Sequence, residues 1–181
     1  MLPTRPTRDE PITGGPRSLG MDALQATGPF DTFTGLPVHA LVVHAVVVLL
    51  PLTAAGAIAI ALVPRWSVRF GVLVPLLALA STVASVVAQK SGEQLAQRVG
   101  VPAVHSQLGA GVKWWAAALL VVTTALWWSD RRRDGPRSTG VKVLAGLVVI
   151  VALGATGWVV RTGDSGARAV WEPVVSRTSP K

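Results

Sequence analysis

The sequence predicts an all-α protein: a four-helix transmembrane bundle with a disordered N-terminal tail. Half of the 181 residues are hydrophobic and only 14% are charged, whereas soluble domains average about 25% charged residues. Four apolar stretches dominate the chain, and about 20 helical residues are enough to cross a hydrocarbon core of about 30 Å. Tryptophans lie near the ends of these stretches, as they do at the headgroup level of membranes. The expected spans are residues 38–63, 70–89, 110–128 and 141–160.

The chain divides into an N-terminal tail, a membrane domain that contains the four spans, and a C-terminal tail. Residues 1–37 contain six prolines, five glycines and few bulky apolar groups, so they bury too little surface to offset the entropy cost of ordering. We therefore expect residues 1–33 to be disordered, residues 34–172 to form one membrane domain and residues 173–181 to form a C-terminal tail. No separate soluble catalytic module fits beside four spans in this length.

Each span has local features that favour a helix. The first and fourth contain no acidic residue, and their only lysine or arginine, Lys142, lies at an end where it can reach the interface. The second helix should continue for a turn or two into the 90–109 connection, until Gly100 and Pro102 break it. Pairs of tryptophans bound the third span on both sides. After the fourth span, the glycines near Asp164 predict a tight turn.

The distribution of basic residues predicts the orientation in a plasma membrane. With four spans, both termini lie on one side and the connections 64–69 and 129–140 lie on the other. By the positive-inside rule, these short connections are cytoplasmic and the N- and C-termini are extracytoplasmic. The basic residues in and beside the two connections are Arg65, Arg69, Arg131, Arg132, Arg133, Arg137 and Lys142.

Charge and composition exclude several functions. The net charge of +8 does not indicate nucleic-acid binding, because the basic residues lie mainly in tails and connections; the lipid bilayer is the expected partner. The chain has no cysteine, which excludes disulfides, thiolate ligands and a cysteine nucleophile. It also has no phosphate-binding glycine loop, GxSxG elbow, HExxH helix or EF-hand loop. The absence of these catalytic motifs favours a protein that is not an enzyme. The sequence also shows no convincing internal repeat.

The three histidines of the chain all map to one end of the predicted bundle. His39 and His44 lie in the outer part of the first span, and His105 just precedes the third. Imidazoles from two facing helices can hold a b-type haem. Because His39 and His44 are separated by about 140° around a helix, they face different neighbours. We expect His44 and His105 to be the haem-ligand pair to test first, with His39 as the other candidate ligand.

Oxygen ligands at the same end offer a second interpretation. Glu93 follows the second span and Asp164 follows the fourth, so both converge with His39 and His105 on the outer end. These four residues have the nitrogen and oxygen ligands that a divalent metal or a proton relay uses. The simpler alternatives are a solvated loop contact for Glu93 and a turn-shaping role for Asp164.

Several motifs together resemble a bacterial family. The most specific is a G-x-P-x-H-x-x-x-x-H pattern that opens the first span, formed by Gly35, Pro37, His39 and His44. The others are SGEQL at 91–95, HSQLG at 105–109 and RTGDSGARAVW at 161–171. Over residues 33–172 the chain resembles the bacterial membrane proteins grouped as domain-of-unknown-function family twenty-two thirty-one. The resemblance implies a four-helix integral membrane protein with histidines near one face and no established activity.

Two functions are compatible with these observations. The first is an integral plasma-membrane protein whose outer histidines bind haem or a metal for electron transfer, together with a redox partner or membrane complex. The alternative is a non-catalytic membrane or assembly component in which the histidines only form interhelical hydrogen bonds. Either could be a homo-oligomer. Transport is least supported, because the middle of the spans offers hydroxyl groups but no acidic residue.

Overall fold

The structure is a computed structural model and describes residues 32–33, 36–100 and 102–178. The predicted disordered tail therefore lies outside the described residues, apart from Thr32 and Phe33. These two residues form strand β1 (Thr32–Phe33), which pairs antiparallel with strand β2 (Leu36–Pro37), so that Thr32 lies opposite Pro37. The strand pair leads directly into the first helix.

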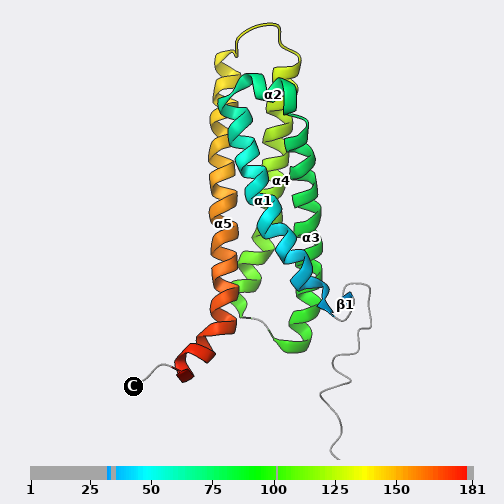
Figure 1. Ribbon diagram of the computed structural model, residues 1–181, viewed down its shortest axis with the longest axis vertical. Helices are drawn as coiled ribbons and strands as arrows, with labels where there is room; N and C mark the ends of the chain where they lie inside the picture. Colours follow the sequence, from blue (N-terminus) through cyan, green and yellow to red (C-terminus); the bar gives the residue numbers. More distant parts are fainter. Residues whose placement is uncertain (1–31, 34–35, 101, 179–181) are drawn as a thin grey trace, which may run out of the picture.

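Four long helices form the body of the molecule and confirm the predicted all-α bundle (Figure 1). Each is long and apolar enough to cross a membrane. A short helix fills the first connection, where the sequence predicted only a link between spans. In chain order the helices are α1 (Val38–Leu62), α2 (Pro64–Phe70), α3 (Leu73–Val99), α4 (Ala103–Arg131) and α5 (Thr139–Thr178).

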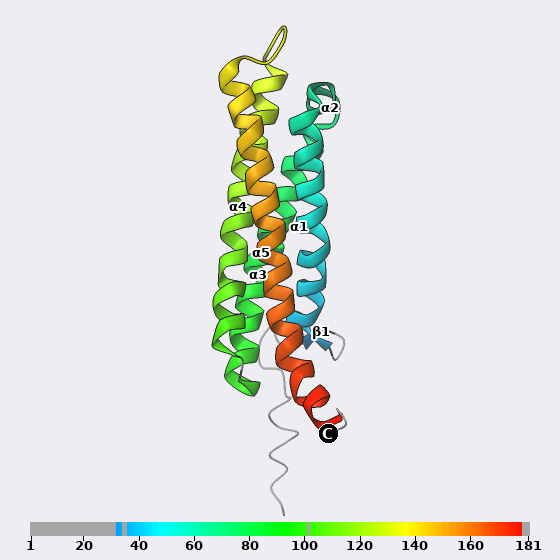
Figure 2. The same cartoon turned by 90° about the vertical axis from the view of Figure 1, so that its left-hand side faces the viewer.

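The long helices are arranged so that α1 and α4 lie diagonally across the bundle. Helix α1 packs against α3 and α5, and α4 packs against the same two helices. Two views at right angles show that α1 and α4 begin at the same end and run parallel, while α3 and α5 run in the opposite direction (Figures 1 and 2). The N-terminal turns of α1 and α4 therefore lie at the same end as the C-terminal parts of α3 and α5.

The helices extend beyond the predicted spans at this end. Helix α3 continues to Val99 and stops at Gly100, whose φ of 71° lies in the left-handed region that favours glycine. This confirms the predicted continuation of the second helix. The tight turn predicted at Asp164 is wrong, because α5 continues through it to Thr178. Glycine costs only about 1 kcal/mol in a helix, and packing of this segment against α4 can offset that cost.

The interior of the bundle is filled by medium-sized apolar side chains and by hydroxyl groups that form hydrogen bonds. Leu50, Leu119 and Val148 are completely buried. Between α1 and α3, the buried hydroxyls of Thr53 and Ser81 lie 3.1 Å apart, and each also donates to a carbonyl one turn earlier in its own helix. Because each hydroxyl has a partner, these polar groups can lie in an apolar interior.

Helices α4 and α5 approach each other closely through glycine and tryptophan. The indole Nε1 of Trp158 donates to the carbonyl of Leu108, at 2.9 Å, across the surface of Gly111. The ring of Trp115 packs equally closely over Gly154. Large apolar side chains such as Ile150 are instead more than half exposed on the outside of the bundle, as expected for a surface that faces lipid.

Candidate histidine site

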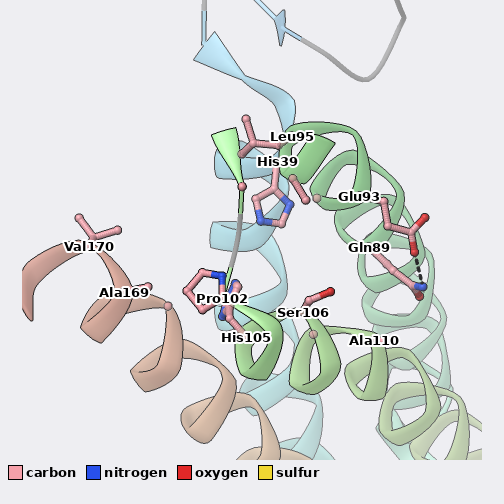
Figure 3. A pocket seen from close by; sticks show the side chains of 15 residues that line it. His39, Gln89, Glu93, Leu95, Pro102, His105, Ser106, Ala110, Ala169 and Val170 are labelled. Atoms are coloured by element: carbon pink, nitrogen blue, oxygen red, sulfur yellow. Dashed lines mark hydrogen bonds between the residues drawn. The ribbon is translucent and has the colours of Figure 1, made fainter. Parts of the chain in front are cut away.

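A cavity of about 360 Å³ opens at the end of the bundle where α1 and α4 begin. His39 from α1 and His105 from α4 both line it, with Glu93 and Gln89 on the α3 side and Val170 on the α5 side (Figure 3). A smaller cavity of about 80 Å³ continues into the bundle and is lined by the same two histidines. The diagonal helices thus contribute one imidazole each to a shared space.

His39 is fixed by the facing end of α3. Its Nδ1 lies 2.9 Å from the carbonyl oxygen of Ala88 and 3.5 Å from Oγ of Ser91. The Ser91 hydroxyl donates to carbonyls in its own helix, including that of Ala88 at 3.1 Å. The imidazole is therefore held by a carbonyl and a hydroxyl that are themselves hydrogen-bonded.

His105 has the same kind of environment on α5. Its Nδ1 lies 3.2 Å from the carbonyl oxygen of Thr162 and 3.0 Å from Oγ of Ser165. The Ser165 hydroxyl donates to the Thr162 carbonyl at 2.7 Å. Each histidine thus contacts a carbonyl and, three residues later on the same helix, a serine.

These contacts determine which ring nitrogen carries the proton. A backbone carbonyl only accepts hydrogen bonds, so Nδ1 of His39 and of His105 must be the N–H donor. In the neutral imidazole, Nε2 is then unprotonated and keeps its lone pair. This is the arrangement found around histidine ligands, in which one nitrogen is oriented by a backbone acceptor and the other binds the metal.

Glycines next to the serines allow the rings to lie this close to the helices. A Cβ atom added to Gly92 would lie 2.8 Å from Cε1 of His39, and one added to Gly166 would lie 2.9 Å from Cε1 of His105. Carbon atoms pack comfortably at about 3.5–4.0 Å. Any other residue at these two positions would therefore displace the imidazole.

The two halves of the bundle build this site with one repeated module. Each half places a histidine in the first turn of its opening helix and a five-residue Ser-Gly motif on its returning helix, AQKSG at 88–92 and TGDSG at 162–166. The histidine and serine are 52 residues apart in the first half and 60 in the second. This corrects the impression from the sequence that no repeat exists. The two Ser-Gly motifs were the signal of this repeat in the sequence. They are hard to recognise because the distance from histidine to serine along the chain differs between the halves.

The other candidate residues lie in different environments. His44 is exposed on the outer surface of α1, where its Nδ1 bonds to the Ala40 carbonyl of its own helix, and it lines neither cavity. Glu93 is at the cavity rim and accepts a hydrogen bond from Gln89 at 2.7 Å. Asp164 is on the exposed face of α5, paired with Arg168 at 2.9 Å. His39 and His105 therefore share the cavity, and Glu93 belongs to its lining without forming a three-residue cluster with them. His44 and Asp164 lie elsewhere.

The cavity brings two imidazoles together without a third metal ligand beside them among the described residues. Across the described residues, no three histidine, aspartate or glutamate side chains gather closely enough to hold a metal. A divalent ion usually takes three or more protein ligands, whereas haem iron needs only two axial ligands because the porphyrin supplies the other four. In the described residues, neither Nε2 atom of His39 and His105 has a hydrogen-bond partner, and both rings line the same cavity.

The fold and the site together define a class of protein: a four-span integral membrane helical bundle with paired histidines at one end. The chain belongs to the family described as Predicted membrane protein (DUF2231), whose model matches residues 35–179. This confirms the resemblance inferred from the sequence motifs. No curated protein and no solved structure matches the chain.

Proposed function

We propose that this protein is a plasma-membrane electron-transfer protein that binds one b-type haem between His39 and His105. The observation that carries the proposal is the repeated hydrogen bonding of the two rings, in which each Nδ1–H is held by a carbonyl on a neighbouring helix. Both Nε2 atoms are then available as ligands at the cavity that the rings share. His39 replaces His44 as the partner of His105.

The residues around the rings support this role. The backbone carbonyls and serine hydroxyls orient the imidazoles before any ligand binds, which lowers the entropy cost of ligation. The glycines at 92 and 166 leave space beside the rings. When bound, haem would supply a one-electron iron couple, and the opening of the cavity at the end of the bundle would let a redox partner approach one edge of it.

The proposed orientation places the histidine end outside the cytoplasm. The opposite end of the bundle contains α2 and the α4–α5 connection (Figure 1), and seven basic residues lie in or beside these two short segments. Such residues are retained on the cytoplasmic side. Electron exchange would then occur at the extracytoplasmic surface of the plasma membrane.

The main alternative uses the same hydrogen bonds for structure alone. In that case His39 joins α1 to α3 and His105 joins α4 to α5, and the Nε2 atoms have no task. The two functions can be separated by asparagine, because its side-chain amide nitrogen can occupy the place of Nδ1 and still donate to the carbonyl. Asparagine has no group at the position of Nε2.

The experiment compares His39→Asn and His105→Asn with the unchanged protein, each expressed with haem supplied and purified in detergent. We expect each variant to lose the haem absorption band while its thermal unfolding midpoint in the absence of haem stays close to that of the unchanged apoprotein. His44→Asn is the matched control, since it changes the same residue type in α1 outside the cavity, and it should retain haem. Haem binding that survives both substitutions would reject this ligand pair, and stoichiometric metal without haem would favour a metal site.

A further inference from the structure

A second cavity, of about 400 Å³, lies at the end of the bundle opposite the histidines. It is formed by α2, the last residues of α4, the α4–α5 connection and the first turn of α5. Its charged lining consists of Asp130, Arg133, Arg137 and Lys142, and Pro64 and Val68 of α2 form an apolar wall.

Two of these charges neutralise each other and form the rigid part of the cavity. Arg137 binds Asp130 through two hydrogen bonds of 2.6 and 2.9 Å, and their side chains are only 7% and 3% exposed. The same guanidinium donates to the carbonyl oxygens of Ile60 and Ala61 at the end of α1. Arg137 therefore has its partners within the protein and contributes no free charge.

In the described part of the chain, Arg133 and Lys142 form no direct ion pair, although Asp130 attracts Arg133 electrostatically. Because Asp130 is already paired with Arg137, the cavity lining keeps two positive charges in excess. Among the residues that the structure describes, the buried Nε–H of Arg133 has no hydrogen-bond acceptor, and Nη1 reaches only the Pro136 carbonyl at 3.5 Å. Neighbouring arginines are different, because Arg132 lies over the ring of Trp128 at 4.0 Å. A buried donor without an acceptor is unfavourable, and an anionic oxygen would satisfy it.

The position of the cavity indicates the source of such an oxygen. Trp66 and Phe70, on the same short helix α2 whose Pro64 and Val68 line the cavity, are 51% and 47% exposed. Exposed aromatic side chains at the end of a transmembrane bundle lie at the headgroup level. Lipid phosphates lie at that same level. The apolar wall formed by Pro64 and Val68 suits a ligand whose phosphate is attached to acyl chains rather than a free ion.

We propose that this cavity binds the phosphate of an anionic phospholipid headgroup, with Arg133 and Lys142 as the phosphate-binding residues. Basic pockets at the ends of transmembrane helices bind such headgroups. The site is separate from the histidine cavity and does not depend on haem. Lipid bound here would contact α2, α4 and α5 together.

The test uses the full-length protein, purified in detergent with its lipid removed, and measures binding of short-chain phosphatidylglycerol by native mass spectrometry. Near a membrane surface each basic residue is expected to change affinity about five-fold, so the double variant Arg133→Gln with Lys142→Gln should bind about 25-fold more weakly. The control, Arg65→Gln with Arg132→Gln, removes two charges at the same end outside the cavity and should lose no more than about three-fold. Equal losses in both would show a nonspecific charge effect and overturn the proposal.

Two further measurements complete the test. Short-chain phosphatidylcholine, which has no net charge, should bind at least ten-fold more weakly than phosphatidylglycerol, and millimolar inorganic phosphate should not displace the lipid. Displacement at that concentration would identify free phosphate as the ligand and overturn the lipid assignment. If the double variant does not fold, Lys142→Gln alone is used, because this exposed residue lies in the first turn of α5, and an unchanged affinity would reject its role.

Discussion

Arg137 provides the most direct test of how the basic end of the bundle is held together. We predict that Arg137→Ala lowers the free energy of unfolding by about 3 kcal/mol. Its guanidinium makes a two-pronged contact with buried Asp130 and also donates to two carbonyls of the last turn of α1, at Ile60 and Ala61. The single side chain thus links the α4–α5 connection to both α4 and α1.

The magnitude follows from what the substitution leaves behind. Removing one partner of a buried ion pair typically costs about 3–5 kcal/mol, because the other charge stays buried without compensation. The lower end of this range applies here, since the adjoining cavity can admit water to Asp130 and to the two carbonyls. Arg137→Lys keeps the charge but loses the two-pronged geometry, so it should recover only part of the loss.

The free energies of unfolding can be measured by titrating the protein, held in micelles of a mild detergent, with a denaturing detergent. Arg132→Ala is the control, because its guanidinium is exposed over Trp128, where a cation–π contact contributes about 0.5–1 kcal/mol. The double variant Arg137→Ala with Asp130→Asn should be more stable than Arg137→Ala alone, since it no longer buries an unpaired carboxylate. Equal losses for Arg137→Ala and Arg132→Ala would refute the reasoning.

Other predictions concern the histidine end. Gly166→Ala should reduce haem content several-fold, because the new Cβ would lie 2.9 Å from His105; Gly163→Ala, which points into open space on the same helix, should retain haem and unfold at a slightly higher temperature. A haem content for Gly166→Ala equal to that of Gly163→Ala would contradict this. Asp164→Asn should change neither cofactor content nor unfolding, since among the described residues it pairs only with Arg168, at an exposed position. Loss of cofactor measured in the same spectra would restore Asp164 as a ligand.

The number and order of the transmembrane helices could be predicted from the sequence, because hydropathy reports directly which segments can enter a bilayer. The end of α3 could also be predicted, from Gly100 and Pro102, but the end of α5 could not. Helix α5 reaches Thr178, well past its apolar segment, because a helix needs only satisfied backbone hydrogen bonds to continue into the interface. Hydropathy therefore indicates where the apolar segment of a helix ends, whereas the helix itself can continue beyond that point.

The site was predictable only in part. Helical periodicity indicated that His39 and His44 face different neighbours, and the structure places His39 at the cavity and His44 on the outside. Periodicity gives the angle between two side chains but not which of them faces inward, so the predicted first choice of His44 could not be corrected from the sequence. That choice depends on how α1 packs against α3.

The glycines near Asp164 show why local signals can mislead. Glycine after a helical segment usually marks a turn, yet Gly166 lies within α5 and provides space for His105. The same is true of Gly92 and His39. A glycine required by a long-range contact looks the same in the sequence as a glycine required by a turn, and only the tertiary structure distinguishes them.

The absorption spectrum of the purified full-length protein, recorded oxidised and after reduction with dithionite, tests the haem proposal most directly. Expressed with haem supplied, the protein should show a Soret band that shifts on reduction and should contain equimolar haem by the pyridine haemochrome method. A protein with no absorption beyond that of tryptophan, and with no haem in that assay, would contradict the proposal and leave the paired histidines as links between helices.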